Sequence, residues 1–111
     1  MKTLVKTSLL AIEVSKVFFT SNKKGLKMTR EEVEQICKET GITVLFADGF
    51  DDAIMGIGRS FQYYKLIYSR DKVLEILMDE HDMDITEAEE YYEYNIAGAY
   101  VGENTPIFME F

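Results

Sequence analysis

Apolar residues between positions 29 and 111 follow two different periods, and this alternation narrows the possible folds more than any other feature. Three short runs are of the strand type, being mostly β-branched, aromatic or otherwise apolar: 42–47 (ITVLFA), 53–57 (AIMGI) and 65–69 (KLIYS). A fourth follows the chain's one proline, in 106–111 (PIFMEF). Segments of helical spacing separate these runs. We therefore expect an α+β domain, with a mostly antiparallel sheet of about four strands and two or three helices packed on one side.

Two helices have clear boundary signals. Thr29 followed by Glu32 predicts a capping box that opens a helix over 30–39, and the next glycine ends it. A second helix is expected over 71–80, where apolar residues recur on one face. Between them, the turn 48–52 (DGFDD) joins the first two apolar runs, which predicts a hairpin.

A third helix is expected to begin near Asp84 to Thr86, where Thr86 and Glu89 can form a capping box. Its spacing predicts these inward positions: Ala88, Tyr91 or Tyr92, Asn95 and Ala99. A buried amide needs hydrogen-bond partners, so Asn95 is expected to tie the loop 98–106 to the helix. Contact with a ligand is the alternative role for Asn95.

Charge is segregated along the chain, whose formal net charge is -8. Residues 71–111 hold twelve carboxylates and one basic residue, Lys72, whereas residues 1–27 hold six lysines and one glutamate. An acidic face attracts basic protein surfaces or cations and repels nucleic acid and anionic lipid. The charge change also suggests that residues 1–27 are an N-terminal extension or accessory element and that 28–111 form a single α+β domain.

The cysteine content and the N-terminal residues indicate in which cellular compartment the protein is expected. A single cysteine, Cys37, can form no internal disulfide, which favours a reducing environment. The N-terminus has a basic end and an apolar stretch like a signal peptide, but Glu13 and Lys16 interrupt that stretch. No apolar run reaches the ~18 residues of a membrane-spanning helix. We expect a cytoplasmic protein that contacts no membrane.

The aspartates of the 48–52 turn are candidate cation ligands. Asp48, Asp51 and Asp52, with Glu93 or Glu103, offer the carboxylate oxygens that divalent cations prefer. Aspartate and glycine are also what a turn requires, and we consider that explanation stronger, so no metal site is assigned. The single histidine, His81, completes no catalytic triad.

The stretch 56–59 (GIGR) is a candidate anion site. Gly56 and Gly58 would let backbone N–H groups approach an anion, and Arg59 would clamp it. The alternative is that both glycines permit a β-bulge or a tight exit from a strand.

Two stretches, DGFDDAIMGIG at 48–58 and YYEYNIAGAYVGENTPIF at 91–108, together resemble a known group of sequences. This group consists of small uncharacterised proteins of tailed phages and bacteria with the motifs DGF(D/E)DA and FN-x-x-GA(Y/W)VGE-x-TP. The resemblance spans roughly residues 28–108. It implies a phage or prophage origin and a host-directed accessory role in the host cell cytoplasm, and it transfers no catalytic residue.

Our first functional hypothesis is a non-enzymatic accessory protein of the phage type that binds and blocks a basic surface of a host protein, as an anti-defence inhibitor does. Its acidic helices and neighbouring tyrosines would make the contact: Asp79, Glu80, Asp82, Asp84, Glu87, Glu90, Glu93, Tyr94 and Tyr100. For any single acid, a solvated helix face is an equally good explanation. No cofactor is implied, and the sequence leaves the oligomeric state open. Direct nucleic-acid binding is not expected, because no basic residue follows Lys72.

Two alternative functions remain. One is a protein that binds or sequesters a nucleotide-like anion at Gly56, Gly58, Arg59 and Asn95, with Tyr63 or Tyr64 stacking on it. The other is a metal-dependent hydrolase that uses the aspartates of the 48–52 turn.

Overall fold

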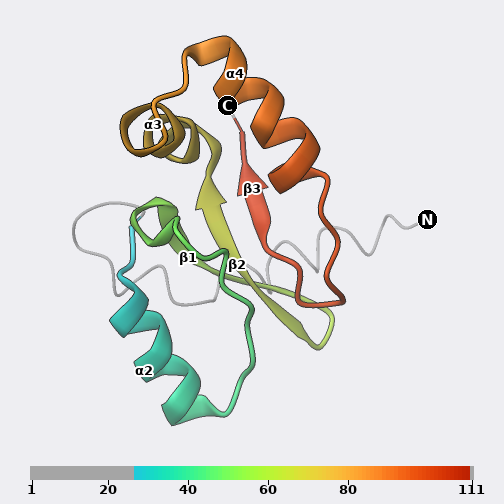
Figure 1. Cartoon of the computed structure of the whole chain (residues 1–111). Coiled ribbons are helices and arrows are strands. Elements are labelled where there is room, and N and C mark those ends of the chain that lie inside the picture. The colour runs from blue at the N-terminus through green and yellow to red at the C-terminus, as the bar shows by residue number, and fades with distance from the viewer. Residues whose placement is uncertain (1–26, 111) are drawn as a thin grey trace.

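The computed structural model describes residues 27–110, so the proposed extension 1–27 lies almost wholly outside the described residues. The fold is α+β, as expected, with three α-helices and a three-stranded sheet in this part of the chain. The elements are α2 (Arg30–Thr40), β1 (Ile54–Ser60), β2 (Tyr63–Ser69), α3 (Arg70–Glu80), α4 (Ile85–Tyr91) and β3 (Ile107–Met109) (Figure 1). Within residues 27–110, no helix is both long enough and apolar enough to cross a membrane.

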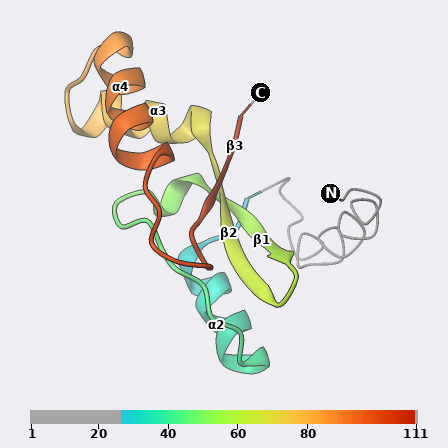
Figure 2. The ribbon, with the colours of Figure 1, turned by 90° about the vertical axis from the view of Figure 1, so that its right-hand side faces the viewer.

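The sheet is mixed and has the order β1-β2-β3. β1 and β2 form an antiparallel hairpin, whereas β3 runs parallel to β2, with Tyr68 opposite Phe108. The expectation of about four mostly antiparallel strands is therefore close, but not correct in detail. The reason is the connection: two helices lie between β2 and β3, and such a crossover brings the chain back in the parallel direction. Figure 2 shows the 98–106 loop running along the sheet from α4 to the start of β3.

The run 42–47 is not a strand, which corrects the predicted hairpin. β1 pairs with β2 instead, and 42–47 pairs with no strand of the described sheet. Side chains satisfy its backbone: the Ala47 N–H donates to the Tyr68 hydroxyl oxygen at 2.7 Å, and the Thr43 carbonyl accepts from the Asn104 side chain at 3.1 Å. Its apolar side chains still pack on the core, so the run is half-buried although it is not a strand.

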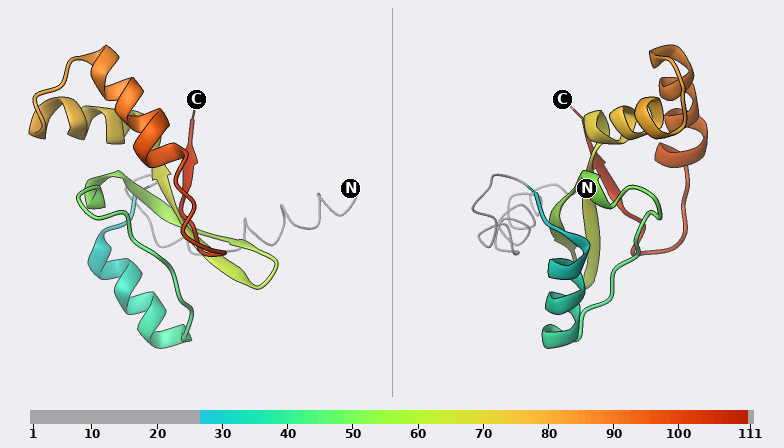
Figure 3. Two further views of the ribbon diagram at one scale, coloured as in Figure 1. Left: turned by 45° about the vertical axis from the view of Figure 1, so that its right-hand side comes forward. Right: turned by 60° about the vertical axis from the view of Figure 1, so that its left-hand side comes forward.

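The first two helices begin and end where their signals lie. Thr29 and Glu32 form the expected capping box of α2, and Gly41 ends the helix with a φ of +78°. α3 covers the predicted 71–80 and begins one residue earlier, with Ser69 as N-cap. Figure 3 shows α2 at one end of the sheet and α3 with α4 at the other.

The start of α4 differs in detail from the prediction. Asp84 is the N-cap, and its box partner is Glu87, so the predicted box of Thr86 with Glu89 is wrong. An aspartate is a stronger N-cap than a threonine, and it stands first in the sequence.

A π-helical turn, Tyr92–Ala97, follows α4 directly and changes which residues face inward. Ala88 and Tyr92 are buried, as expected. Asn95 is exposed, which corrects its predicted burial, and Ile96 packs on the core in its place. A π-helical turn holds more residues than an α-helical turn, so positions counted at α-helical spacing drift off the buried face.

The hydrophobic core contains residues from Met28 to Tyr92, and Phe108 packs against it. Fully buried side chains come from α2, β1, β2, α3 and the α4 region, among them Val33, Ile57, Tyr68, Leu77 and Tyr92. Phe108 of β3 stacks on Tyr68, with ring centroids 5.5 Å apart, and meets Tyr92 edge-on at 5.7 Å. These three rings fix β3 against the helices and so position the site described next.

Candidate functional site

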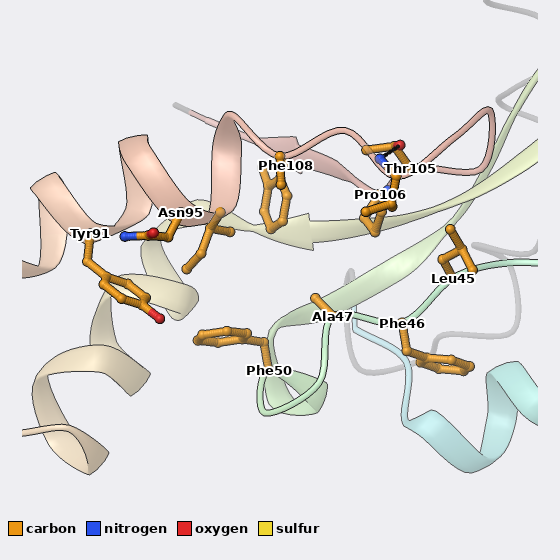
Figure 4. Close-up of a pocket in the computed structure, with 12 residues that line it drawn as sticks. Leu45, Phe46, Ala47, Phe50, Tyr91, Asn95, Thr105, Pro106 and Phe108 are labelled. Carbon is orange, nitrogen blue, oxygen red and sulfur yellow. Dashed lines mark hydrogen bonds between the residues drawn. The ribbon is translucent and has the colours of Figure 1, made fainter.

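An apolar cavity of about 270 Å³ opens where three segments of the chain meet (Figure 4). Its walls come from the 45–50 segment, from the end of α4 with the π-helical turn, and from the 99–108 segment. The lining residues are Leu45, Phe46, Ala47, Phe50, Tyr91, Asn95, Ile96, Ala99, Val101, Thr105, Pro106 and Phe108. The two stretches that carry the family resemblance, 48–58 and 91–108, therefore meet here, since Phe50 belongs to the first and eight lining residues belong to the second.

Packing behind the lining residues holds the walls in place. Phe108 is held by the aromatic contacts with Tyr68 and Tyr92. On the opposite wall, the Arg30 guanidinium lies 4.1 Å from the centre of the Phe46 ring, a cation–π contact. The cavity is thus part of the packed structure of the domain.

Polar groups at the cavity are few. The Thr105 hydroxyl is committed to its own loop, because it donates to the Gly102 carbonyl at 2.6 Å and accepts from the Val101 N–H at 2.9 Å. Asn95 is exposed, and its side chain makes no hydrogen bond with another residue of the described chain. Figure 4 shows the Asn95 amide and the Tyr91 ring side by side on one wall. An amide in this position can both donate to and accept from a bound molecule.

The tie of the 98–106 loop to the helix that was predicted for Asn95 is not formed, and Asn104 fastens the same loop elsewhere. The Asn104 Nδ2 donates to the Tyr64 carbonyl at 2.9 Å as well as to Thr43 at 3.1 Å, which fastens the 98–106 loop to β2 and to the 42–47 segment. Sequence reasoning missed this residue, although an asparagine between Gly102 and Pro106 is a typical turn signal.

The seven acids of the proposed partner-binding set, from Asp79 to Glu93, are all exposed. Two of them have structural roles, because Asp84 and Glu87 cap α4 through bonds of 2.8 and 2.9 Å. The nearest basic residues are engaged with other acids: Arg70 lies 3.7 Å from Glu89, and Lys72 lies 3.1 Å from Glu75. The remaining five acids of the set form no ion pair within residues 27–110: Asp79, Glu80, Asp82, Glu90 and Glu93.

Two tyrosines predicted beside these acids are well exposed. Tyr94 is 83% exposed and Tyr100 is 73% exposed, and Val101 next to it is 61% exposed. Their neighbours in the sequence line the cavity, since Tyr94 precedes Asn95 and Tyr100 lies between Ala99 and Val101. Large exposed apolar side chains that gather on a surface often mark an interaction site.

The candidate anion site is not formed as a loop. Gly56 and Gly58 lie buried inside β1, where they pair with Ile67 and Lys65. The register shifts between Ile54 and Gly56, which fits the bulge that was the alternative explanation. Gly56, Gly58 and Arg59 do not line the cavity that Asn95 lines, so the proposed set of ligand-binding residues is split between two places.

Arg59 is engaged within the hairpin. Its Nε donates to the Phe61 carbonyl at 2.7 Å, and its guanidinium lies 5.8 Å from the centre of the Tyr64 ring. These contacts hold Arg59 along β1 and β2, away from the role of an anion clamp.

The aspartates of the 48–52 turn serve the fold. Arg30 of α2 lies 3.2 Å from Asp51 and 3.8 Å from Asp48, and the Asp52 carbonyl accepts from Lys27 at 3.3 Å. Hydrogen bonding to Glu34 raises the pKa of Arg30, and the charge of Asp51 adds to this effect. In the part of the chain that the structure describes, no three His, Cys, Asp or Glu side chains are placed to hold a metal ion.

The single histidine, His81, is the exposed C-cap of α3.

Two buried tyrosines support the cavity from behind. Burial raises the pKa of Tyr68 to about 12. Burial also raises the pKa of Tyr92, and the hydrogen bond that its hydroxyl donates to Glu110 at 2.8 Å acts in the same direction. Both phenols therefore stay neutral near pH 7 and act as structural hydrogen-bonding groups.

Comparison of the chain with protein-family models, with curated proteins and with solved structures finds no match.

Proposed function

We propose that this protein is a non-enzymatic accessory protein of the phage type, which binds a basic surface of a host protein and blocks it. The observation that carries the proposal is a set of five acids that lack ion-pair partners in the described chain and lie on α3, in the loop after it, on α4 and on the π-helical turn. A host defence protein with a phosphate-binding groove is a suitable target, because an acidic face can occupy such a groove in place of nucleic acid. The protein would then act as an anti-defence inhibitor.

None of these five side chains forms an ion pair or a hydrogen bond in the described chain, although Asp82, with a φ of +57°, takes the left-handed conformation in the turn after α3. Asp84 and Glu87 are explained by the capping box and Glu89 by Arg70, but Asp79, Glu80, Asp82, Glu90 and Glu93 repel one another on one end of the molecule. Like charges gathered on a surface disfavour the compact state. A basic partner would turn this repulsion into attraction.

The exposed tyrosines supply the contact area that charge alone lacks. Tyrosine combines a large surface with few rotatable bonds, so it loses little entropy when a partner covers it. Tyr94 follows Glu93 directly in the π-helical turn, which places an aromatic ring among the acids. Charge would accelerate the encounter, and the tyrosines would slow dissociation.

The proposal can be tested by measuring how salt changes association. A partner captured from host extract is purified, and its association rate with the full chain is measured from ~0.1 M to ~0.5 M NaCl, over which the Debye length falls from ~10 to ~4 Å. We expect the association rate to fall about tenfold or more across this range. A rate that stays constant would contradict the proposal.

Charge reversal gives a matched comparison. Glu90→Lys with Glu93→Lys should slow association further, whereas Glu31→Lys with Glu39→Lys makes the same change of charge on exposed positions of α2 and should have little effect. Asp84 and Glu87 are left intact, because their loss would disturb the start of α4. Equal effects of the two pairs would show that only net charge matters and that the acidic end of the molecule is not the binding face.

A further inference from the structure

We propose that the apolar cavity receives one large apolar side chain, aromatic or leucine-like, from a basic segment of the partner protein. The inference rests on the proposed function and deepens it, since it names the group on the partner that enters the site. The cavity would give the complex a fixed register, which an acidic face alone cannot do.

The size of the cavity favours a side chain over a free ligand. Its volume of about 270 Å³ falls just below the range of ~300 to 1,000 Å³ usual for small-molecule sites. No charged side chain lines it, so it offers no counter-ion to a nucleotide or a metal complex. A single buried anchor in a well-packed pocket is what protein interfaces commonly use.

The charges around the cavity favour a cationic segment as the source of that side chain. Two of the three lining segments carry close by in the sequence an exposed acid that forms no ion pair in the described chain: Glu87 stands one turn before Tyr91, and Glu103 stands two residues after Val101. The basic residue packed on this region, Arg30, is already neutralised by Asp51 and Asp48. In a partner segment with an apolar residue flanked by lysine or arginine, the apolar side chain would fill the cavity and the cations would pair with the acids around it.

The π-helical turn places a hydrogen-bonding group at the cavity. If the turn were α-helical, Asn95 would lie on the buried face, as its spacing from Ala88 and Tyr91 predicts; instead it is exposed and lines the cavity. Its amide can bond both the N–H and the carbonyl of a peptide backbone. π-helical turns are frequent at functional sites, where they re-aim side chains in this way.

The test uses the full chain and three synthetic peptides. The first has lysines on both sides of one phenylalanine, the second has alanine in place of the phenylalanine, and the third keeps the phenylalanine but replaces the lysines by serine. Affinity is measured by fluorescence anisotropy, and the contact is mapped by amide chemical shifts. We expect the second peptide to bind about tenfold to a hundredfold more weakly than the first, the range for burying a phenylalanine side chain. The first peptide should shift the amides of Phe50, Tyr91 and Ala99.

Two variants confine the effect to the cavity. Ala99→Trp should fill the opening and abolish the preference for phenylalanine. Ala97→Trp should keep that preference, because Ala97 is exposed two residues earlier, at the end of the π-helical turn, and does not line the cavity. Equal binding of the first two peptides, a preference that persists in Ala99→Trp, or binding of no peptide would overturn the inference. If the first two bind equally and lose affinity in salt, the acidic-face function stands without the cavity. Equal binding of the serine peptide and the lysine peptide would contradict the proposed function as well.

Discussion

At the scale of single residues, Asn95 and Asn104 show which roles can be predicted from the sequence and which cannot. The sequence places Asn95 on an apolar helix face and predicts that it ties the 98–106 loop to the helix, but Asn95 is exposed at the cavity, and Asn104 ties the loop to β2 and to 42–47 instead. The prediction failed because it assumed one helical period through Ala99, and the π-helical turn changes that period. Contact with a ligand, the alternative role for Asn95, stays a prediction.

We expect Asn104→Ala to destabilise the domain by about 1 to 3 kcal/mol, because it leaves two carbonyl acceptors without the donor that the fold provides. Asn95→Ala is the control and should change the unfolding free energy by less than about 0.5 kcal/mol. Urea denaturation measures both, and amide exchange should show lost protection in 42–47 and 98–106 for the first variant alone. Comparable losses in the two variants would show that Asn95 has a structural role.

Helices were predicted better than strands, for a physical reason. The limits of α2 and α3 depend on caps and on residues within one or two turns, and the sequence displays these directly. Strand formation depends on a distant partner: 42–47 has strand-type composition, yet β2 pairs with β1 and β3. Side-chain hydrogen bonds to 42–47 replace a ladder, and no local pattern announces them.

The capping box at the start of α4 can be tested by substitution. Asp84→Ala should cost about 1 kcal/mol, because the Glu87 N–H and the end of the helix dipole lose their partner. Glu87→Gln should cost less than Asp84→Ala, since glutamine can make the same bond back to the Asp84 N–H. Glu90→Ala, which removes an exposed acid outside the box, is the control. If all three variants unfold at the same urea concentration as the unchanged protein, the packing of Ala88 and Tyr92 alone sets the start of α4.

At the scale of the whole molecule, the sequence predicted the fold class and the concentration of acid in 71–111, but not how distant segments meet. The crossover through α3 and α4 brings β3 beside β2 and Phe108 beside Tyr68, which completes the cavity. The sequence therefore identifies residues of each cavity wall as candidates. The cavity itself depends on contacts between residues about sixty positions apart in the sequence, such as Asn104 with Thr43. The acid-rich stretch 79–93 keeps its charge in the fold, because five of its acids form no ion pair in the described chain and lie on α3, on α4, on the π-helical turn and in the loop between the two helices.

The proposed division of the chain into 1–27 and 28–111 predicts the behaviour of a truncated protein. The buried core of the described residues runs from Met28, which is 1% exposed, to Tyr92, with Phe108 packed against it. A protein lacking residues 1–26 should therefore unfold cooperatively within a few degrees of the full chain. Met28→Ala in the truncated protein is the control, and removing this buried side chain should cost about 2 to 5 kcal/mol and lower the melting temperature clearly. Insoluble or non-cooperative truncated protein would instead mean that the apolar residues Leu9, Ile12, Val17 and Phe18 belong to the core, and the domain would then have to be drawn to include them.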